Sequence, residues 1–291
     1  MLHSEGWLIG DGGLELYYQR WSPSETVRAV VGIVPGLGSH SGLFGSLITG
    51  LVAMGCAVYA VDLRGHGRSP GQRGYLNRWQ EYCGDVKGFY QTMIAQNPGV
   101  PCFLLGHSLG ATVVLDDALQ APESLAGVIA MAPAIGPVGV SPLKLGIGRL
   151  LSWVWPRFAL DTGIPEGAGS QNPETVAAYA TDPLRHRWGT ARLVTEFLQA
   201  SSRLQKQLLS LRVPLLILQG SEDRVAPPVG SRQLFQQLPL IDKEYREYSG
   251  GFHDLHNDIC AQQVALDVFN WVDRHVKGEL LLCKWEKPVS R

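Results

Sequence analysis

The chain has 291 residues, 45% of them hydrophobic and only 18% charged, so it can bury a large core and is not disordered. Its 25 basic and 26 acidic residues give a formal net charge of -1 without a local basic patch, which argues against a nucleic-acid partner. The longest uncharged stretch, 29–61, is broken by Pro35 and several glycines, and such a backbone does not span lipid. Because no Lys or Arg precedes the first apolar residues, we also expect no signal peptide, and a protein that is cytoplasmic or peripheral to a membrane.

Short apolar runs alternate with helix-length segments along most of the chain, which is typical of a mostly parallel sheet covered on both faces. The Ser-Pro-Ser turn at 22–24 favours an antiparallel hairpin between the first two strands. We predict one α/β domain, with strands at 14–21, 27–34, 57–62, 102–106, 127–132, 214–219 and 244–248. The predicted helices are 43–54, 78–96, 109–120, 230–237 and 259–276.

The alternation fails between residues 136 and 211, where helical stretches are separated by Pro and Gly clusters and no strand is expected. We predict a helical cap here, inserted into a core made of residues 1–135 and 212–291. Its densest apolar segment, 143–158, includes Trp153 and Trp155. A helix packed on the main domain is the favoured interpretation. The alternative is an exposed apolar rim that admits a lipid-like substrate or touches a membrane surface.

The motif Gly-His-Ser-Leu-Gly at 106–110 lies between an apolar strand and a helix, the context that a nucleophile elbow needs. Ser108 would project its hydroxyl above the sheet, and the following helix N-terminus would stabilise an oxyanion. A second Gly-x-Ser-x-Gly match surrounds Ser69, but Pro70 follows it and has no backbone N–H to donate. We therefore predict that Ser108 is the nucleophile.

A nucleophilic serine needs a base and an acid that orients the base, and in this architecture they follow in the order acid, then histidine. Asp223 lies just after the strand at 214–219 and is the candidate acid, with its neighbour Glu222 the less favoured alternative. His253 follows two glycines after the last strand and is the candidate base. His256 is its competitor, but it falls where a helix should begin.

The second oxyanion donor is expected in the Gly-rich loop at 35–42, where Leu37 is the candidate, while Leu109 would donate from the elbow. Further candidates for contact with the substrate are Gly36, His107, Trp153 and Trp155. The histidines lack metal-ligand spacing and the five cysteines lack any CxxC pair, so we expect no metal, no cofactor and reduced thiols.

Together these segments resemble the α/β-hydrolase fold, and within it the monoacylglycerol lipase and lysophospholipase group, over nearly the whole chain. The segments that carry the resemblance are 36–42, 65–69, 106–110, Thr-Asp-Pro-Leu at 181–184, 218–223 and His-Asp-Leu-His at 253–256. The resemblance implies an eight-stranded, mostly parallel sheet, a triad of Ser108, Asp223 and His253, and oxyanion donors at Leu37 and Leu109. One departure is Pro35, since family members usually have His before the first glycine of this loop.

The expected function is hydrolysis of carboxylic esters of lipids, monoacylglycerols or lysophospholipids, through an acyl-enzyme on Ser108. Two alternatives stay open. One is another capped hydrolase of this fold, such as a small-ester esterase, a C–C bond hydrolase or a peptidase, and the other is a non-catalytic ligand receptor on the same scaffold.

Overall fold

Continuous apolar runs form the central strands of one large sheet in the computed structural model, which describes residues 1–120, 125–136, 142–278 and 284–286, and only the backbone of 142–145 and 284–286. The sheet order is β1-β2-β4-β3-β5-β6-β9-β10-β11. Strands covered on both faces are apolar throughout. The five inner ones are buried at every residue: β4 (Cys56–Val61), β3 (Ala29–Val34), β5 (Cys102–His107), β6 (Gly127–Met131) and β9 (Leu215–Gly220).

The entry hairpin differs from the expected one. β2 (Glu15–Ser22) pairs antiparallel with β1 (Leu2–Ile9) and with β4, and not with β3. β3 instead lies parallel between β4 and β5. The tight turn is therefore the 3-10 turn at Asp11–Gly13, whose glycines adopt positive φ, rather than the Ser-Pro-Ser segment.

The outer strands complete the sheet. β10 (Lys243–Tyr248) pairs parallel with β9, and eight strands from β1 to β10 form the mostly parallel sheet that the sequence predicts. A three-residue strand, β11 (Lys284–Glu286), adds to its edge.

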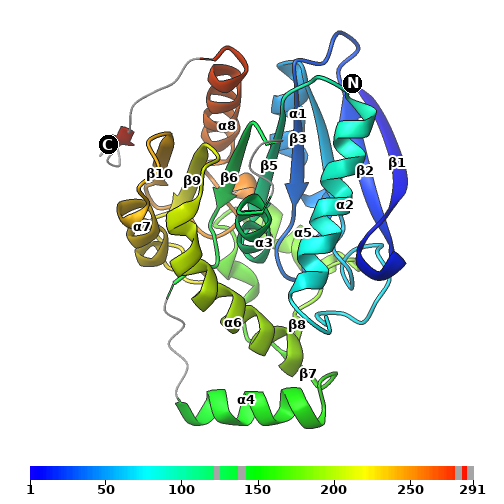
Figure 1. Ribbon diagram of the computed structural model, residues 1–291, viewed down its shortest axis with the longest axis vertical. Coiled ribbons are helices and arrows are strands. Elements are labelled where there is room, and N and C mark those ends of the chain that lie inside the picture. The colour runs from blue at the N-terminus through cyan, green and yellow to red at the C-terminus, as the bar shows by residue number, and fades with distance from the viewer. Residues whose placement is uncertain (121–124, 137–141, 279–283, 287–291) are drawn as a thin grey trace.

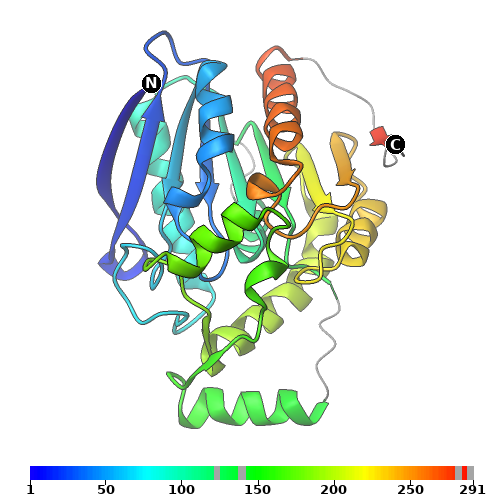
Figure 2. The same ribbon diagram turned by 180° about the vertical axis from the view of Figure 1, so that it is seen from behind.

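Helices cover both faces and enclose two apolar clusters (Figures 1 and 2). On one face lie α1 (Gly45–Ala53) and α8 (Ala261–Val276), whose buried side chains pack with Phe44 and Trp271. On the other face lie α2 (Gln80–Gln96), α3 (Leu109–Ala118) and α7 (Pro228–Gln237). The predicted α/β architecture is confirmed.

The segment predicted as a cap contains α4 (Pro142–Val154), β7 (Ala159–Asp161), α5 (Pro173–Thr181), β8 (Trp188–Thr190) and α6 (Ala191–Gln207). Residues 137–141 lie outside the described part. No strand was expected here, but β7 and β8 pair antiparallel over three residues each. The polar contacts of α6 with the core include Arg203 with Asp116 at 2.5 Å and Glu196 with the Trp79 N–H at 2.9 Å.

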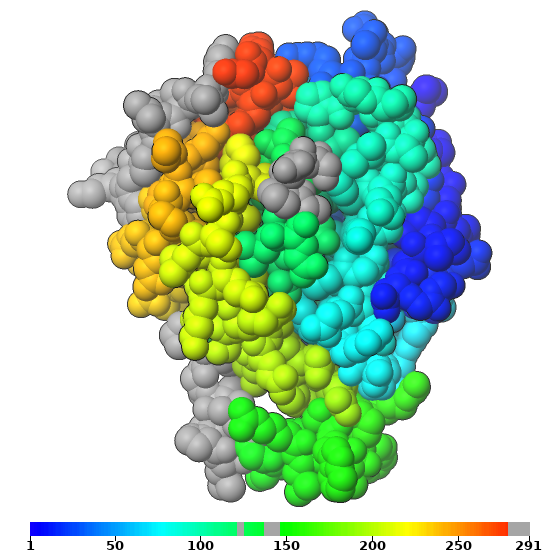
Figure 3. Space-filling view, in the orientation of Figure 1, coloured from blue at the N-terminus to red at the C-terminus, as the bar shows by residue number. Residues whose placement is uncertain are grey.

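The position of α4 corrects the favoured sequence interpretation. This helix packs along α6 at one end of the molecule and does not reach the sheet (Figures 1 and 3). Four of its described apolar side chains are exposed: Ile147, Leu150 (61%), Trp153 (79%) and Val154. An apolar run has the same pattern whether a core or solvent faces it, so the sequence alone did not distinguish the two.

Among the described residues, no helix combines the length and the hydropathy needed to cross a bilayer. Four cysteines, at 56, 83, 102 and 260, are free thiols, and Cys283 lies outside the described part. Burial raises the pKa of Cys56 and of Cys102 to about 11, which keeps both protonated at neutral pH.

Candidate active site

Ser108 stands on a sharp turn between β5 and α3. Its backbone angles, φ 54° and ψ -118°, are strained for a residue with a side chain. The flanking glycines have no room for one either, since a Cβ at Gly106 would lie 2.4 Å from the Ala111 Cα, and one at Gly110 would lie 2.2 Å from the Val34 carbonyl oxygen. The turn thus has the geometry of the predicted elbow.

The two other residues of the predicted triad are bonded to each other. The Nδ1 atom of His253, in the loop after β10, lies 2.8 Å from the Oδ2 atom of Asp223, in the loop after β9. The other carboxylate oxygen of Asp223 accepts the N–H groups of Val225 at 2.8 Å and Ala226 at 2.9 Å. With Nδ1–H donated to the fixed carboxylate, the Nε2 atom of His253 keeps its lone pair and can act as a base.

Burial by itself lowers the pKa of His253, but the hydrogen bond and negative charge of Asp223 outweigh it and raise the pKa above its ordinary value. Glu222, the alternative acid, is exposed. Ser108 and His253 both line a cavity of about 300 Å³, together with Leu37 and Asp254. The structure therefore brings the candidate nucleophile, the candidate base and the candidate oxyanion loop to one cavity.

Two histidines that the sequence analysis considered, His256 and His107, have structural environments. His256 is buried and stacks on Phe44, with ring centroids 4.1 Å apart, and burial lowers its pKa to about 3. His107 is also buried, its Nε2 lies 3.2 Å from the His253 carbonyl oxygen, and burial lowers its pKa to about 4. Both rings are neutral at neutral pH, and neither lines the cavity beside Ser108.

One group of described side chains could offer metal ligands. His107, His253 and Asp254 each place one donor atom within 4.8 Å of the others. A cation held there would draw on His253, whose Nδ1 is committed to Asp223 and whose Nε2 is the candidate base. The absence of a metal and of a cofactor stays a prediction.

The loop after β3 places a backbone donor beside the serine. A Cβ on Gly36 would lie 2.9 Å from the Ser108 Cβ, so only glycine lets the loop pass this close. Among the described residues, no protein acceptor takes a hydrogen bond from the N–H of Leu37 or of Leu109. Two unpaired N–H groups next to the nucleophile are what an oxyanion hole requires.

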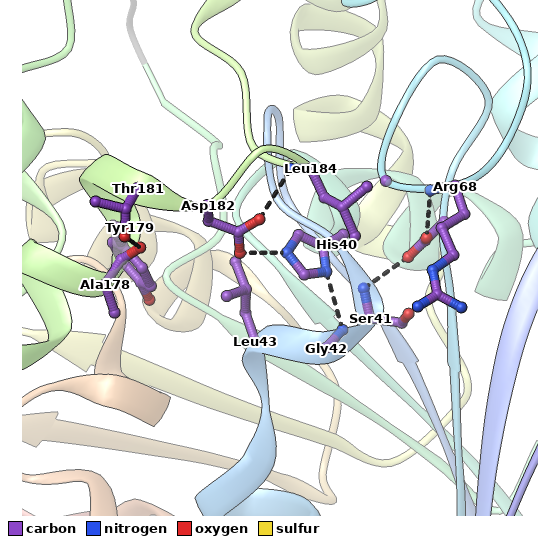
Figure 4. A network of polar contacts seen from close by, with 12 residues as sticks. His40, Ser41, Gly42, Leu43, Arg68, Ala178, Tyr179, Thr181, Asp182 and Leu184 are labelled. Atoms are coloured by element: carbon purple, nitrogen blue, oxygen red, sulfur yellow. Dashed lines mark hydrogen bonds and ion pairs between the residues drawn. The ribbon is translucent and has the colours of Figure 1, made fainter.

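Residues of the cap hold this loop, which the sequence did not reveal (Figure 4). The Nε2 atom of His40 lies 2.8 Å from the Oδ2 atom of Asp182, and its Nδ1 accepts the Gly42 N–H at 3.1 Å. The His186 N–H donates to the Gly38 carbonyl oxygen at 3.2 Å. The Thr-Asp-Pro-Leu segment was noted only as a family marker, and no spacing rule connects it to a loop some 140 residues earlier.

Ser69 belongs to a buried structural network. Its Oγ accepts the Tyr17 N–H at 2.9 Å and donates to the Asp62 carbonyl oxygen at 2.6 Å. It does not line the cavity at Ser108. The second Gly-x-Ser-x-Gly match therefore fixes β2 to the loop after β4.

Two candidate substrate contacts lie elsewhere. Trp153 and Trp155 are 79% and 59% exposed and do not line the cavity, because α4 and the turn after it face away from the core. Tyr179 of α5 is the aromatic residue that does line it. The rest of the lining is mixed. It combines the apolar residues Leu37, Ile164, Pro165, Ala180 and Val225 with the polar or charged residues Thr162, Glu166, Asp182, Arg185, His186, Arg187 and Asp254.

A serine on a strained strand-to-helix turn, facing the same cavity as a buried Asp–His pair, is the arrangement of serine hydrolases with the α/β-hydrolase fold. Comparison with known proteins agrees. The sequence model of the family described as serine aminopeptidase, S33, matches residues 25–259, and the chain belongs to this family.

Several individual relatives are monoacylglycerol lipases. A monoacylglycerol lipase of Mycolicibacterium smegmatis is 30% identical over 275 residues, covering 94% of this chain and 98% of the relative. The monoglyceride lipase of Rattus norvegicus is 31% identical and covers 92% of this chain and 90% of its own length. The crystal structure of Paleococcus ferrophilus monoacylglycerol lipase superposes with a TM-score of 0.82 at 31% identity, covering 90% of this chain and all of that one (100%). The predicted resemblance to the monoacylglycerol lipase group is confirmed.

Proposed function

We propose that this chain hydrolyses carboxylic esters of lipids, with one acyl chain per substrate, through an acyl-enzyme on Ser108. The proposal rests on one observation. Ser108, His253 and Leu37 line the same cavity, and His253 is hydrogen-bonded to Asp223. The similarity to monoacylglycerol lipases over most of both chains supports the substrate class.

The geometry suggests the following steps. The Nε2 atom of His253 takes the hydroxyl proton as the Ser108 Oγ bonds to the ester carbonyl carbon, and Asp223 stabilises the imidazolium that forms. The N–H groups of Leu37 and Leu109 bind the oxyanion. The imidazolium then gives its proton to the departing alcohol oxygen. Water, deprotonated by the same base, cleaves the acyl-enzyme and releases the carboxylic acid and free Ser108.

A second hollow provides room for an acyl chain. It measures about 390 Å³, shares Ile164, Pro165 and Val225 with the cavity at Ser108, and adds Phe252. The cavity at Ser108 would hold the alcohol and the ester. The acyl chain would extend into the second hollow, whose lining is more apolar although Glu222 and Arg224 also contribute to it. Trp153 and Trp155, which were expected to contact the substrate, line neither of these two hollows.

We expect kcat/KM for monoacylglycerols to rise from short to medium acyl chains, and triacylglycerol to be a poor substrate because only one chain fits beside Ser108. Each buried CH₂ contributes about 0.8 kcal/mol, so eight further carbons give at most ~6 kcal/mol. The measurement is an ester panel assayed below the critical micelle concentration. A flat or falling profile would contradict the proposal and favour a small-ester esterase, and cleavage of peptides without ester turnover would favour a peptidase.

We further propose that α4 rests on a lipid surface. Ile147, Leu150 and Val154 follow helical spacing, and with Trp153 and Trp155 they leave five large apolar side chains at least half exposed at one end of the molecule (Figure 3). A patch of this kind is unusual on a monomeric surface and suits a membrane interface, where Trp is favoured.

A Trp153→Ser, Trp155→Ser double variant should bind phospholipid vesicles several-fold more weakly, because each indole loses apolar contact with lipid. Co-sedimentation with vesicles measures the effect, and Ile241→Ser is the matched control, since Ile241 is 70% exposed outside the cap. Turnover of a short, soluble ester should stay the same. Equal vesicle binding by the double variant and the wild type would refute membrane contact through α4.

A further inference from the structure

The cavity at Ser108 contains a cation that forms no ion pair among the described residues. Arg185 lines this cavity, and its guanidinium carbon lies 3.7 Å from the centre of the Tyr179 ring. Among the described residues its side chain forms no ion pair and donates no hydrogen bond, and its Nε is buried without a partner. A guanidinium has five N–H donors, so this one retains most of its capacity to bind an anion.

The neighbouring arginine is different. Arg187 also lines the cavity, but its guanidinium pairs with Asp161 at 2.8 Å and lies 3.6 Å from Glu166. It is about half exposed, at the rim. Arg187 therefore already has the carboxylates that Arg185 lacks.

The acidic groups of the cavity contact other residues. Asp182 pairs with His40 at 2.8 Å, and its other oxygen accepts the Leu184 N–H at 2.8 Å. Asp254 is buried with an oxygen 3.4 Å from the Nε2 atom of His107. Neither forms an ion pair with Arg185 in the described structure, although the charge of Arg185 helps to lower the pKa of both carboxyl groups. The N–H groups of the guanidinium therefore have no direct acceptor among these carboxylates.

Tyr179 holds the guanidinium in place. Its hydroxyl accepts a hydrogen bond from the Nδ2 atom of Asn257 at 2.8 Å, and its side chain is buried. Stacking on a fixed aromatic ring limits the rotamers of an arginine and leaves its N–H edge available. An anion that meets such a group gains charge-assisted hydrogen bonds and loses less entropy than with a mobile side chain.

We infer that Arg185 is a specificity-determining residue that selects esters carrying an anionic group close to the scissile bond. The inference rests on the proposed function and names its substrate class: the simplest candidate is the phosphate of a 1-acylglycerol 3-phosphate. The same chemistry is offered by a carboxylate on the acyl side, as in the hemi-ester of a dicarboxylic acid. The cavity volume of about 300 Å³ leaves space for a small charged group next to the ester.

The test measures kcat/KM for matched pairs below the critical micelle concentration. One pair is a monoacylglycerol and its 3-phosphate with the same chain, and the other is a methyl ester with and without a terminal carboxylate. In Arg185→Gln, the kcat/KM of the charged substrate divided by that of its neutral partner should fall about 10- to 100-fold. This fall is expected for the pair whose anion reaches residue 185, because the variant loses a hydrogen bond to a charged group. Arg185→Lys should recover part of that ratio.

Two controls separate recognition from structure. Arg212→Gln removes an exposed arginine outside the cavity and should leave the ratio unchanged. A Ser108→Ala protein should bind glycerol 3-phosphate more tightly than glycerol, and the added Arg185→Gln change should abolish that difference, which is a readout independent of catalysis.

Equal losses for charged and neutral substrates, or an unchanged ratio in Arg185→Gln, would overturn the inference and reduce Arg185 to a packing partner of Tyr179. Such a result would leave ester hydrolysis by Ser108 intact. A wild-type protein that hydrolyses no ester of the panel would instead refute the proposed function itself.

Discussion

Ser108→Ala is expected to lower kcat for ester hydrolysis by about 10⁴-fold or more, because the remaining groups then have no nucleophile to activate. The fold should survive, since Ser108 makes its backbone bond to the Met131 carbonyl oxygen at 3.0 Å regardless of the side chain. The measurement is steady-state turnover of a monoacylglycerol, together with loss of covalent labelling by a fluorophosphonate. Labelling would also separate the enzyme from a non-catalytic receptor on this scaffold.

Ser69→Ala serves as the matched control, because Ser69 stands in the second Gly-x-Ser-x-Gly match. The variant loses two buried hydrogen bonds, so its free energy of unfolding should drop by about 1–3 kcal/mol while the folded enzyme stays active. An active Ser108→Ala protein combined with an inactive, folded Ser69→Ala protein would reverse the assignment.

His253→Ala should reduce kcat by a similar factor, since no other described side chain of the cavity is bonded to Asp223 as a base must be. The pH profile of kcat/KM for the wild type offers a second check. Catalysis needs neutral His253, and Asp223 raises its pKa, so the rate should fall with acidification at a pH above the ordinary histidine value of about 6.5.

His256→Ala is the control for His253. The His256 ring stacks on Phe44 and is neutral. The change should therefore lower the free energy of unfolding through lost packing and lower kcat only modestly. Turnover that persists in His253→Ala and vanishes in a folded His256→Ala would show that the base was misassigned.

The positions of the candidate site residues could be predicted from the sequence because each lies close to a recognisable strand or motif. Ser108 lies in a motif directly between an apolar run and a helix, and Asp223 and His253 each follow a strand within a few residues. Parallel strands end at one edge of the sheet, so loops far apart in the chain meet there. Knowing the order of strands and loops was enough to place these three residues near one another.

Features that depend on distant contacts were predicted less well. β2 pairs with β1 and β4 because of contacts between strands that are distant in the sequence, and the turn residues at 22–24 do not determine which strands pair. Likewise, Trp153 has the sequence context of a core residue, yet it is 79% exposed on α4, which packs along α6. The position of Arg185 on the Tyr179 ring, next to groups that pair with other residues, could not be predicted from the sequence.

The segment predicted as a cap contacts the loop that carries Leu37. A Cβ on Gly38 would lie 1.9 Å from the His186 carbonyl oxygen, so the two backbones touch, and Asp182 reaches His40 from the same segment. If the cap swung away as one body, the loop that presents the Leu37 N–H would lose both supports. An open molecule would then admit substrate without being able to cleave it, and acyl transfer would begin only after the cap had closed. With such coupling, the acyl-enzyme would not form while bulk water can enter the site freely.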